Sequence, residues 1–240
     1  MPQFLRGDDT YDSASIRRGF TGHTPQMLFR PTTLVLSSGG VRGVAHVGAL
    51  RALFDAGWLG DDSPRTIIGT SAGAVVGALC VLGYTPREMW RVVRHTNLLS
   101  LLRREQRRLT LSGVLSSLAT RFGAIDSSKA KLEGLIRTLV ARSRVADGNP
   151  DLTFGELRRR TGRTLIVCAT DLIAAGPIYF GPCSTPDTAV AYAVRASAAI
   201  PLVFTPVDGR YTDGALVDHY PFYRSPDDAG RTLGVVLVDG

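Results

Sequence analysis

The sequence contains little lysine and little cysteine. Among its 28 basic residues only Lys129 and Lys131 are lysines, so arginine carries the net charge of +7. The three cysteines, Cys80, Cys168 and Cys183, lie far apart and lack the spacing of metal ligands. An odd number of scattered cysteines argues against a disulfide framework and predicts reduced thiols packed in apolar surroundings.

An apolar segment suited to export or membrane insertion is also missing. Residues 1–29 are polar and lack the apolar core of a signal peptide. The one uncharged run long enough to span a bilayer, residues 66–86, starts like a β-strand, contains glycines and ends in a turn. We therefore expect a cytoplasmic or peripheral membrane protein with neither a Sec signal peptide nor a transmembrane helix.

Length and composition predict one large globular domain. The 240 residues are 44% hydrophobic and 20% charged, which allows a substantial core. We expect a poorly ordered N-terminal extension at 1–31 and one domain at 32–240, which includes a helical lid region at 85–150. Arginines cluster at 87–108 and 158–163 and suit an anionic partner such as a membrane surface, acidic lipid or nucleic acid, although solvated helix faces explain the same pattern.

Short β-branched segments alternate with helical patterns along the chain. Threonine caps followed three residues later by glutamate mark helix starts at Thr85 and Thr153. We also expect an extended segment at 201–207, a turn at Asp208-Gly209, and residues 210–212 pairing back on that segment. Strands are expected at 32–36, 66–70, 164–169, 177–180 and 233–238, the last as an edge strand or the end of a truncated chain. This alternation predicts an α/β fold, a three-layer α/β/α sandwich with a mostly parallel central sheet.

Residues 98–118 combine leucines with four arginines, Arg103, Arg104, Arg107 and Arg108. The segment can lie in a membrane interface with its arginines toward lipid phosphates. A lid helix with a solvated basic edge explains the pattern equally well.

The segment Gly69-Thr70-Ser71-Ala72-Gly73 follows a predicted strand and precedes a predicted helix. This G-x-S-x-G order is typical of a nucleophile elbow, in which a serine hydroxyl lies at a helix N-terminus and the glycines permit close approach. A buried small-residue helix packed on a sheet gives the same pattern, so the motif alone leaves both interpretations open.

A second glycine-rich turn, Ser38 to Gly43, follows the preceding strand. Its backbone amides can form an anion cradle, which beside a nucleophilic serine would act as an oxyanion hole. The same residues approximate the dinucleotide fingerprint G-x-G-x-x-G with serine at the first glycine, and Asp61 or Asp62 lies about 20 residues further on.

Two residues late in the chain could act as the base that a serine nucleophile needs. His219 fits the chain order of a serine, aspartate and histidine triad. Asp213 lies at the end of a predicted strand, where a carboxylate can act directly on the serine if desolvation raises its pKa.

Four ordered motifs together resemble the patatin-like phospholipase family over about residues 34–238. They are Leu36 to Gly43, Gly69 to Gly73, Val194 to Pro201 and Asp213-Gly214-Ala215. The resemblance implies a lipid acyl hydrolase that cleaves carboxylic esters of phospholipids or other acyl lipids, with a Ser71–Asp213 dyad, no metal, no cofactor and no nucleic-acid partner. It also implies an oxyanion hole at Gly39, Gly40, Val41 and Arg42, supported by Gly43, Gly69, Gly73 and Gly214.

The chain departs from the family pattern at two places. Ser38 replaces the usual first glycine of the glycine-rich turn, and Asp218-His219 stands where the family usually has Asn-Asn. Two alternatives therefore stay open: a catalytically impaired lipid-binding protein, and a serine and histidine hydrolase or acyltransferase that uses His219.

Overall fold

The computed structural model describes residues 30–60, 63–96 and 127–238. The expected N-terminal extension and the leucine-and-arginine segment at 98–118 fall outside these ranges, so both stay predictions. Within the described residues, none of the helices combines the length and the apolar composition needed to cross a bilayer.

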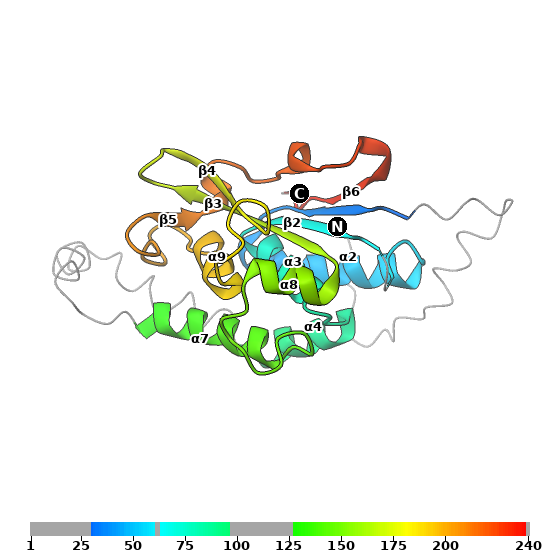
Figure 1. Ribbon diagram of the computed structural model, residues 1–240, viewed down its shortest axis with the longest axis horizontal. Helices are drawn as coiled ribbons and strands as arrows, with labels where there is room; N and C mark the ends of the chain where they lie inside the picture. The colour runs from blue at the N-terminus through cyan, green and yellow to red at the C-terminus, as the bar shows by residue number, and fades with distance from the viewer. Residues whose placement is uncertain (1–29, 61–62, 97–126, 239–240) are drawn as a thin grey trace, which may run out of the picture.

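A mixed sheet with mostly parallel strands forms the centre of the molecule (Figure 1). Its strand order is β4-β3-β2-β1-β6, so β6 lies at the edge, as expected for the last strand. Strands β1, β2, β3 and β6 run parallel, whereas β4 and β5 are antiparallel to β3. The strands are β1 (Thr33–Leu36), β2 (Thr66–Thr70), β3 (Thr164–Asp171), β4 (Gly176–Phe180), β5 (Tyr211–Asp213) and β6 (Thr232–Val235).

Two layers of helices lie below the sheet in Figure 1. The inner layer packs on the sheet, and the outer layer covers the inner one. The inner helices are α2 (Val44–Asp55), α3 (Ala72–Val81), α8 (Phe154–Thr161) and α9 (Val190–Ser197); the outer ones are α4 (Pro86–His95) and α7 (Ser127–Arg142). The 3₁₀ turns η5 (Phe222–Arg224) and η6 (Ala229–Arg231) lie on the opposite side of the sheet. The predicted α/β/α class, with a mostly parallel sheet between layers of helical segments, is confirmed, and in the described residues the longer helices lie on one side of the sheet.

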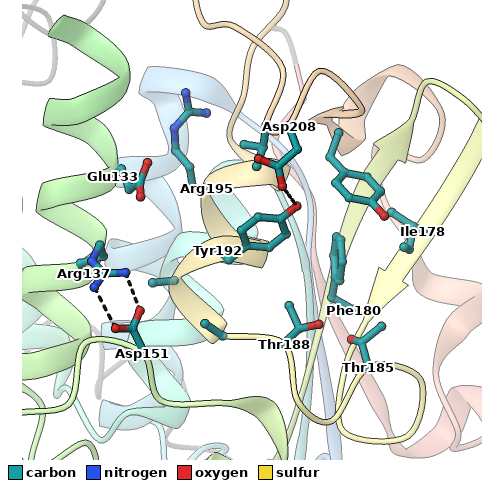
Figure 2. Close-up of a pocket in the computed structure, with 14 residues that line it drawn as sticks. Glu133, Arg137, Asp151, Ile178, Phe180, Thr185, Thr188, Tyr192, Arg195 and Asp208 are labelled. Atoms are coloured by element: carbon teal, nitrogen blue, oxygen red, sulfur yellow. Dashed lines mark hydrogen bonds and ion pairs between the residues drawn. The ribbon is translucent and has the colours of Figure 1, made fainter. Parts of the chain in front are cut away.

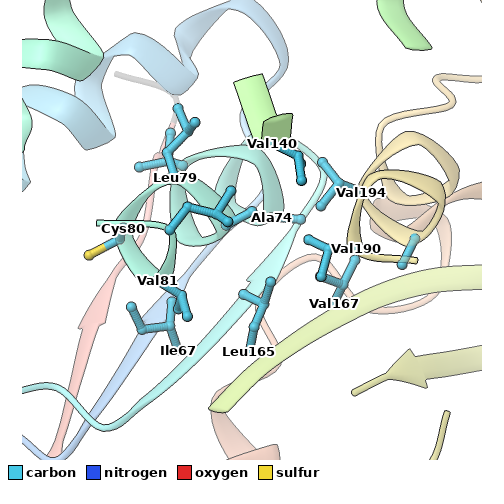
Figure 3. Packing of buried hydrophobic residues seen from close by; sticks show 14 of the residues in the cluster. Ile67, Ala74, Leu79, Cys80, Val81, Val140, Leu165, Val167, Val190 and Val194 are labelled. Carbon is cyan, nitrogen blue, oxygen red and sulfur yellow. The ribbon is translucent and has the colours of Figure 1, made fainter. Parts of the chain in front are cut away.

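The hydrophobic core lies between the sheet and the helices α3, α7 and α9 (Figure 3). Ile67 and Leu165 from adjacent parallel strands face Val81 of α3, and Val140 and Val194 close the other side. These side chains are at most 2% exposed, because the central strands are buried on both faces and α3 is apolar around most of its circumference.

The predicted helix starts are confirmed at both threonine caps. The Thr85 side chain accepts a hydrogen bond from the Glu88 amide at 3.2 Å, and the Glu88 carboxylate accepts one from the Thr85 amide at 2.8 Å. Thr153 and Glu156 form the same reciprocal pair at the start of α8. Each reciprocal pair of threonine and glutamate provides acceptors for backbone amides that a helix N-terminus otherwise leaves without one.

The expected hairpin at 201–212 is confirmed at its turn and contradicted in its first segment. Across Asp208-Gly209, the Val207 amide donates to the Tyr211 carbonyl at 2.7 Å and the Tyr211 amide donates to the Val207 carbonyl at 2.9 Å, whereas the chain before Val207 is not extended. The amides of Val203 and Phe204 donate to the Ile200 carbonyl, so the chain turns after α9. Only an isolated bridge joins Val207 to Tyr211. Strand β5 pairs with β3, because β3 continues past the end of β2 and leaves a free backbone edge at residues 169–171.

Candidate active site

Ser71 lies at a sharp turn between β2 and α3. Its backbone angles are φ 53° and ψ −118°, a region that non-glycine residues rarely occupy. The Ser71 amide donates to Ser197 Oγ at 2.8 Å, and the Ser197 hydroxyl donates to the Cys168 carbonyl at 2.5 Å. This chain of hydrogen bonds ties the turn to α9 and β3 and holds Ser71 in its unusual conformation.

The glycines on either side of Ser71 are required by close backbone approach. A Cβ atom on Gly69 would lie 2.4 Å from the Gly73 carbonyl oxygen, and one on Gly73 would lie 2.4 Å from the Leu36 carbonyl oxygen. Distances below 3.0 Å force the backbone to shift. The structure therefore explains both glycines of the G-x-S-x-G motif by geometry.

Asp213 lies beside Ser71 because β2 and β5 both pair with β3 and end at neighbouring residues of it. Thr70, the last residue of β2, pairs with Cys168, and Asp213, the last residue of β5, pairs with the next residue, Ala169. The two strand ends therefore meet, and the Ser71 hydroxyl donates a hydrogen bond to Asp213 Oδ2 at 2.6 Å. Both residues are 4% exposed.

The Asp213 carboxylate has a second fixed partner and a raised pKa. Its Oδ1 accepts a hydrogen bond from the Ala215 amide at 2.9 Å. Burial raises the pKa of the carboxyl above its ordinary value, and this exceeds the opposing effects of the hydrogen bonds from Ser71 and Ala215 and of the charge on His219. A carboxyl with a raised pKa is a stronger base than an exposed aspartate.

The predicted oxyanion loop is a 3₁₀ turn, η1 (Gly40–Gly43), that follows β1. Gly40 has a φ of 53°, in the left-handed region that favours glycine. The Arg42 amide donates to the Gly39 carbonyl at 3.0 Å and is thus committed within the turn. The amides of Gly40 and Val41 stand at the start of the turn, where a 3₁₀ helix offers them no internal acceptor.

An apolar cavity of about 170 Å³ opens beside Ser71. Gly40 and Val41 line it together with Ser71, so the loop and the serine share one space. Its remaining walls are mostly aliphatic side chains of α2, α3, α4 and α7, and Phe204 closes one side. Such a lining suits a hydrocarbon chain.

A larger cavity of about 640 Å³ lies between α7, α9 and β4 (Figure 2). Neither Ser71 nor Asp213 lines it. Arg137 forms two hydrogen bonds with Asp151, and Tyr192 donates one to Asp208 at 2.7 Å. Because polar groups on its wall already pair with one another and no nucleophile of the predicted motifs faces it, the candidate active site is the smaller cavity.

His219 bonds to Ser38. The Ser38 amide donates to the His219 carbonyl at 2.9 Å, and the Ser38 hydroxyl is hydrogen-bonded to His219 Nδ1. His219 is exposed, whereas Ser38 is buried. The structure thus brings together Ser71 and Asp213 as one pair and Ser38 and His219 as another.

Sequence reasoning missed the part that Ser197 has in the site. Ser197 lies in the Val194 to Pro201 motif, but nothing in its neighbours indicates that its hydroxyl holds the Ser71 amide. Thr170 was missed in the same way: its hydroxyl donates to the Asp213 carbonyl at 2.7 Å. Both contacts join residues far apart in sequence.

The fold and the apolar cavity beside Ser71 define an α/β protein in which a serine lies at a sharp turn at the carboxyl edge of a mostly parallel sheet. The sequence matches the patatin-like phospholipase family over residues 34–224, and the chain belongs to that family. The chain is 30% identical over 193 residues to a probable lipid hydrolase, 463L of Invertebrate iridescent virus 6. The match covers 79% of this chain and 61% of the viral protein.

Two further proteins resemble the chain. The triacylglycerol lipase ptl2 of Schizosaccharomyces pombe is 29% identical over 208 residues, which make up 84% of this chain and 30% of the lipase. The solved structure of ExoU in complex with SpcU, from the type III secretion system of Pseudomonas aeruginosa, superposes with a TM-score of 0.53 at 28% identity. That match covers 72% of this chain and 39% of the solved chain.

Proposed function

We propose that the chain is a serine acyl hydrolase that cleaves carboxylic ester bonds of phospholipids or related acyl lipids. The observation that carries this proposal is the 2.6 Å hydrogen bond from the buried Ser71 hydroxyl to Asp213, made at the wall of an apolar cavity. Ser71 is the nucleophile and Asp213 is the general base. Family membership and the lipid hydrolase among the relatives support a lipid substrate.

The reaction proceeds by double displacement. Asp213 Oδ2 takes the hydroxyl proton as Ser71 Oγ attacks the carbonyl carbon of the ester. The bond between that carbon and the alkoxy oxygen then breaks, and the departing alcohol takes the proton from Asp213. Water attacks the acyl-serine in the second half, Asp213 again accepts the proton and returns it to Ser71, and the fatty acid is released.

The glycine-rich turn supplies electrostatic stabilisation. Gly40 and Val41 line the cavity at the start of η1, and their amides are the donors that we assign to the oxyanion of the tetrahedral intermediate. A single such donor contributes about 3 kcal/mol to transition-state stabilisation. Gly39 and Arg42 complete the loop, with the Gly39 carbonyl fixed by the Arg42 amide.

The cavity takes the acyl chain. Its aliphatic lining offers a hydrocarbon chain burial that stabilises binding by about 25 cal/mol per Å² of apolar surface. A polar head group gains nothing from such walls and stays at the mouth beside the exposed loops. This division favours esters of long-chain fatty acids and leaves both phospholipids and triacylglycerols as substrates.

Two observations favour this assignment over the open alternatives. His219 Nδ1 is engaged by Ser38, whereas Ser71 bonds to Asp213, so the serine at the elbow is paired with the carboxylate. The elbow, the raised pKa of Asp213 and the glycine-rich turn are all present together, which a decayed lipid-binding site would not need.

Release of fatty acid from mixed phospholipid and triacylglycerol emulsions tests the proposal. Ser71→Ala should reduce release to the background rate while the far-UV circular dichroism spectrum stays unchanged. Ser184→Ala, at an exposed serine distant from the elbow in sequence, is the matched control and should keep wild-type turnover. Undiminished release by Ser71→Ala would overturn the assignment of the nucleophile.

A further inference from the structure

The outer face of α4 carries three arginines around a tryptophan. Arg87, Trp90, Arg91 and Arg94 stand at spacings of three, four and seven residues, which places them on one side of a helix. All four are exposed, and Trp90 is 46% exposed. An aromatic side chain therefore stands among exposed basic side chains on this face of α4.

The inner face of the same helix forms a wall of the cavity that contains Ser71. Met89 is 1% exposed, and it lines the cavity together with Val92 and Val93. Because an α-helix with side chains is about 10–12 Å across, the exposed arginines and the cavity lie one helix diameter apart. Figure 1 shows α4 in the outer helix layer, away from the sheet.

The charge around α4 is positive. Arg144 lies 3.6 Å from Glu88, and Arg142 is near enough to act on the pKa of Tyr84, so both stand beside the first turn of the helix. Glu88 is the acidic residue of α4, and its carboxylate is already held by the Thr85 cap.

We propose that this outer face of α4, named here the arginine face (Arg87, Trp90, Arg91, Arg94), docks on an anionic phospholipid surface. Arginine guanidinium groups pair with lipid phosphates, and tryptophan is enriched where its ring can lie at the level of the head groups. The inference rests on the proposed lipid hydrolase function, because a docked α4 brings the bilayer within one helix diameter of the acyl-chain cavity.

A lipid surface fits the arginine face better than a nucleic acid does. Both are polyanions, but a duplex offers phosphates without an apolar layer behind them, and Trp90 would gain nothing there. The aliphatic cavity on the inner face of α4 also binds hydrocarbon rather than nucleotides.

Vesicle sedimentation of the Ser71→Ala protein tests the docking without hydrolysis of the vesicles. We expect binding to phosphatidylcholine vesicles that contain phosphatidylglycerol, and little binding to phosphatidylcholine alone. The triple variant Arg87→Gln, Arg91→Gln, Arg94→Gln should bind the anionic vesicles roughly 100-fold more weakly, since each basic residue near the surface contributes about a factor of five. Trp90→Ala should weaken binding on its own.

The matched control is a triple variant with the same change of charge on another helix. Arg158→Gln, Arg159→Gln, Arg160→Gln neutralises three exposed arginines of α8 and should reduce vesicle binding only slightly. An equal loss in the α8 variant would overturn the proposal in favour of a general effect of net charge. Unchanged binding in the α4 variant would also overturn the proposal. So would a protein that binds duplex DNA but not the anionic vesicles, with DNA binding that Trp90→Ala leaves unaffected.

A failure of docking can be told apart from a failure of the proposed function. With Ser71 intact, the α4 triple variant should hydrolyse a soluble short-chain ester at the wild-type rate and lose turnover on anionic vesicles. If wild-type protein hydrolyses neither substrate, the proposed function fails, while the sedimentation result with Ser71→Ala still decides whether α4 docks.

Discussion

Ser38 and His219 are joined by two hydrogen bonds, one from the Ser38 amide to the His219 carbonyl and one between the Ser38 hydroxyl and His219 Nδ1. These residues occupy the two places where the chain departs from the usual family motifs. The two departures are therefore partners in space. They connect the loop that carries the Gly40 amide to the segment that follows Asp213.

We predict that substitutions at Ser38 and His219 are energetically coupled. Ser38→Gly and His219→Asn should each destabilise the fold, and the double variant should lose about 1 kcal/mol less than the sum of the two, because the same hydrogen bond is lost in each single variant. Denaturant unfolding of the four proteins measures the coupling. Additivity within about 0.3 kcal/mol would show that the two residues do not act as a pair.

The acid limb of the pH profile should respond to His219. The charge on His219 lowers the pKa of Asp213, so His219→Asn should move the acid limb of kcat/KM for a soluble ester to higher pH. Ser38→Ala removes the hydrogen bond but keeps the imidazole, and it should leave the midpoint in place. A midpoint that does not move in His219→Asn, or moves to lower pH, would contradict Asp213 as the titrating base.

Asp213 should cost the folded protein stability at neutral pH. The pKa of Asp213 is raised in the folded state above the ordinary 3.8. Its contribution to the free energy of unfolding is therefore fully present below pH 3.8 and is lost as the pH rises through the folded pKa. Asp213→Asn cannot ionise and should therefore unfold at a higher temperature than wild type at pH 7.

The difference between Asp213→Asn and wild type should shrink as the pH falls toward 3.8. Thermal scans across this range measure it, and Asp228→Asn, at an exposed aspartate, serves as the control that should show no such trend. A lower unfolding temperature for Asp213→Asn at pH 7 would mean that burial does not disfavour the carboxylate.

Enlarging a side chain of the cavity wall should change the preferred chain length. Val93 lines the cavity and is partly exposed, so Val93→Phe can be accommodated while it takes up space that an acyl chain needs. We expect kcat/KM for long-chain esters to fall at least ten-fold relative to a short-chain ester, a loss of about 1.4 kcal/mol of transition-state stabilisation. Val93→Ala should keep the long-chain preference; equal losses for both substrates in Val93→Phe would argue against this cavity as the acyl site.

Much of the fold was predictable because its signals are local. The β-branched run at 66–70, the elbow around Ser71 and the threonine caps each act within a few residues, and each is found where expected. The pairing of β5 with β3 was not predictable, because it depends on the free backbone edge that β3 leaves beyond the end of β2, which no local pattern records.

The candidate site likewise has features that short motifs predict and features that depend on contacts between distant residues. Ser71 and Asp213 stand in short motifs, and the structure places them in direct contact. The anchoring hydroxyl of Ser197 and the bond between Ser38 and His219 join residues 126 and 181 positions apart, so only the folded chain brings them together. The motifs can be recognised from the sequence, whereas the hydrogen bonds of Ser197 and Ser38 that support the site form only when distant segments pack together.

The most direct test of the account is to identify which serine reacts with a fluorophosphonate ester, by mass spectrometry of the labelled peptides. The adduct should form on Ser71 in wild type and in Ser38→Ala, form far more slowly in Asp213→Asn, and form at close to the wild-type rate in His219→Asn. An adduct on Ser38, or labelling of Ser71 that depends on His219 and not on Asp213, would contradict the proposed serine and aspartate pair.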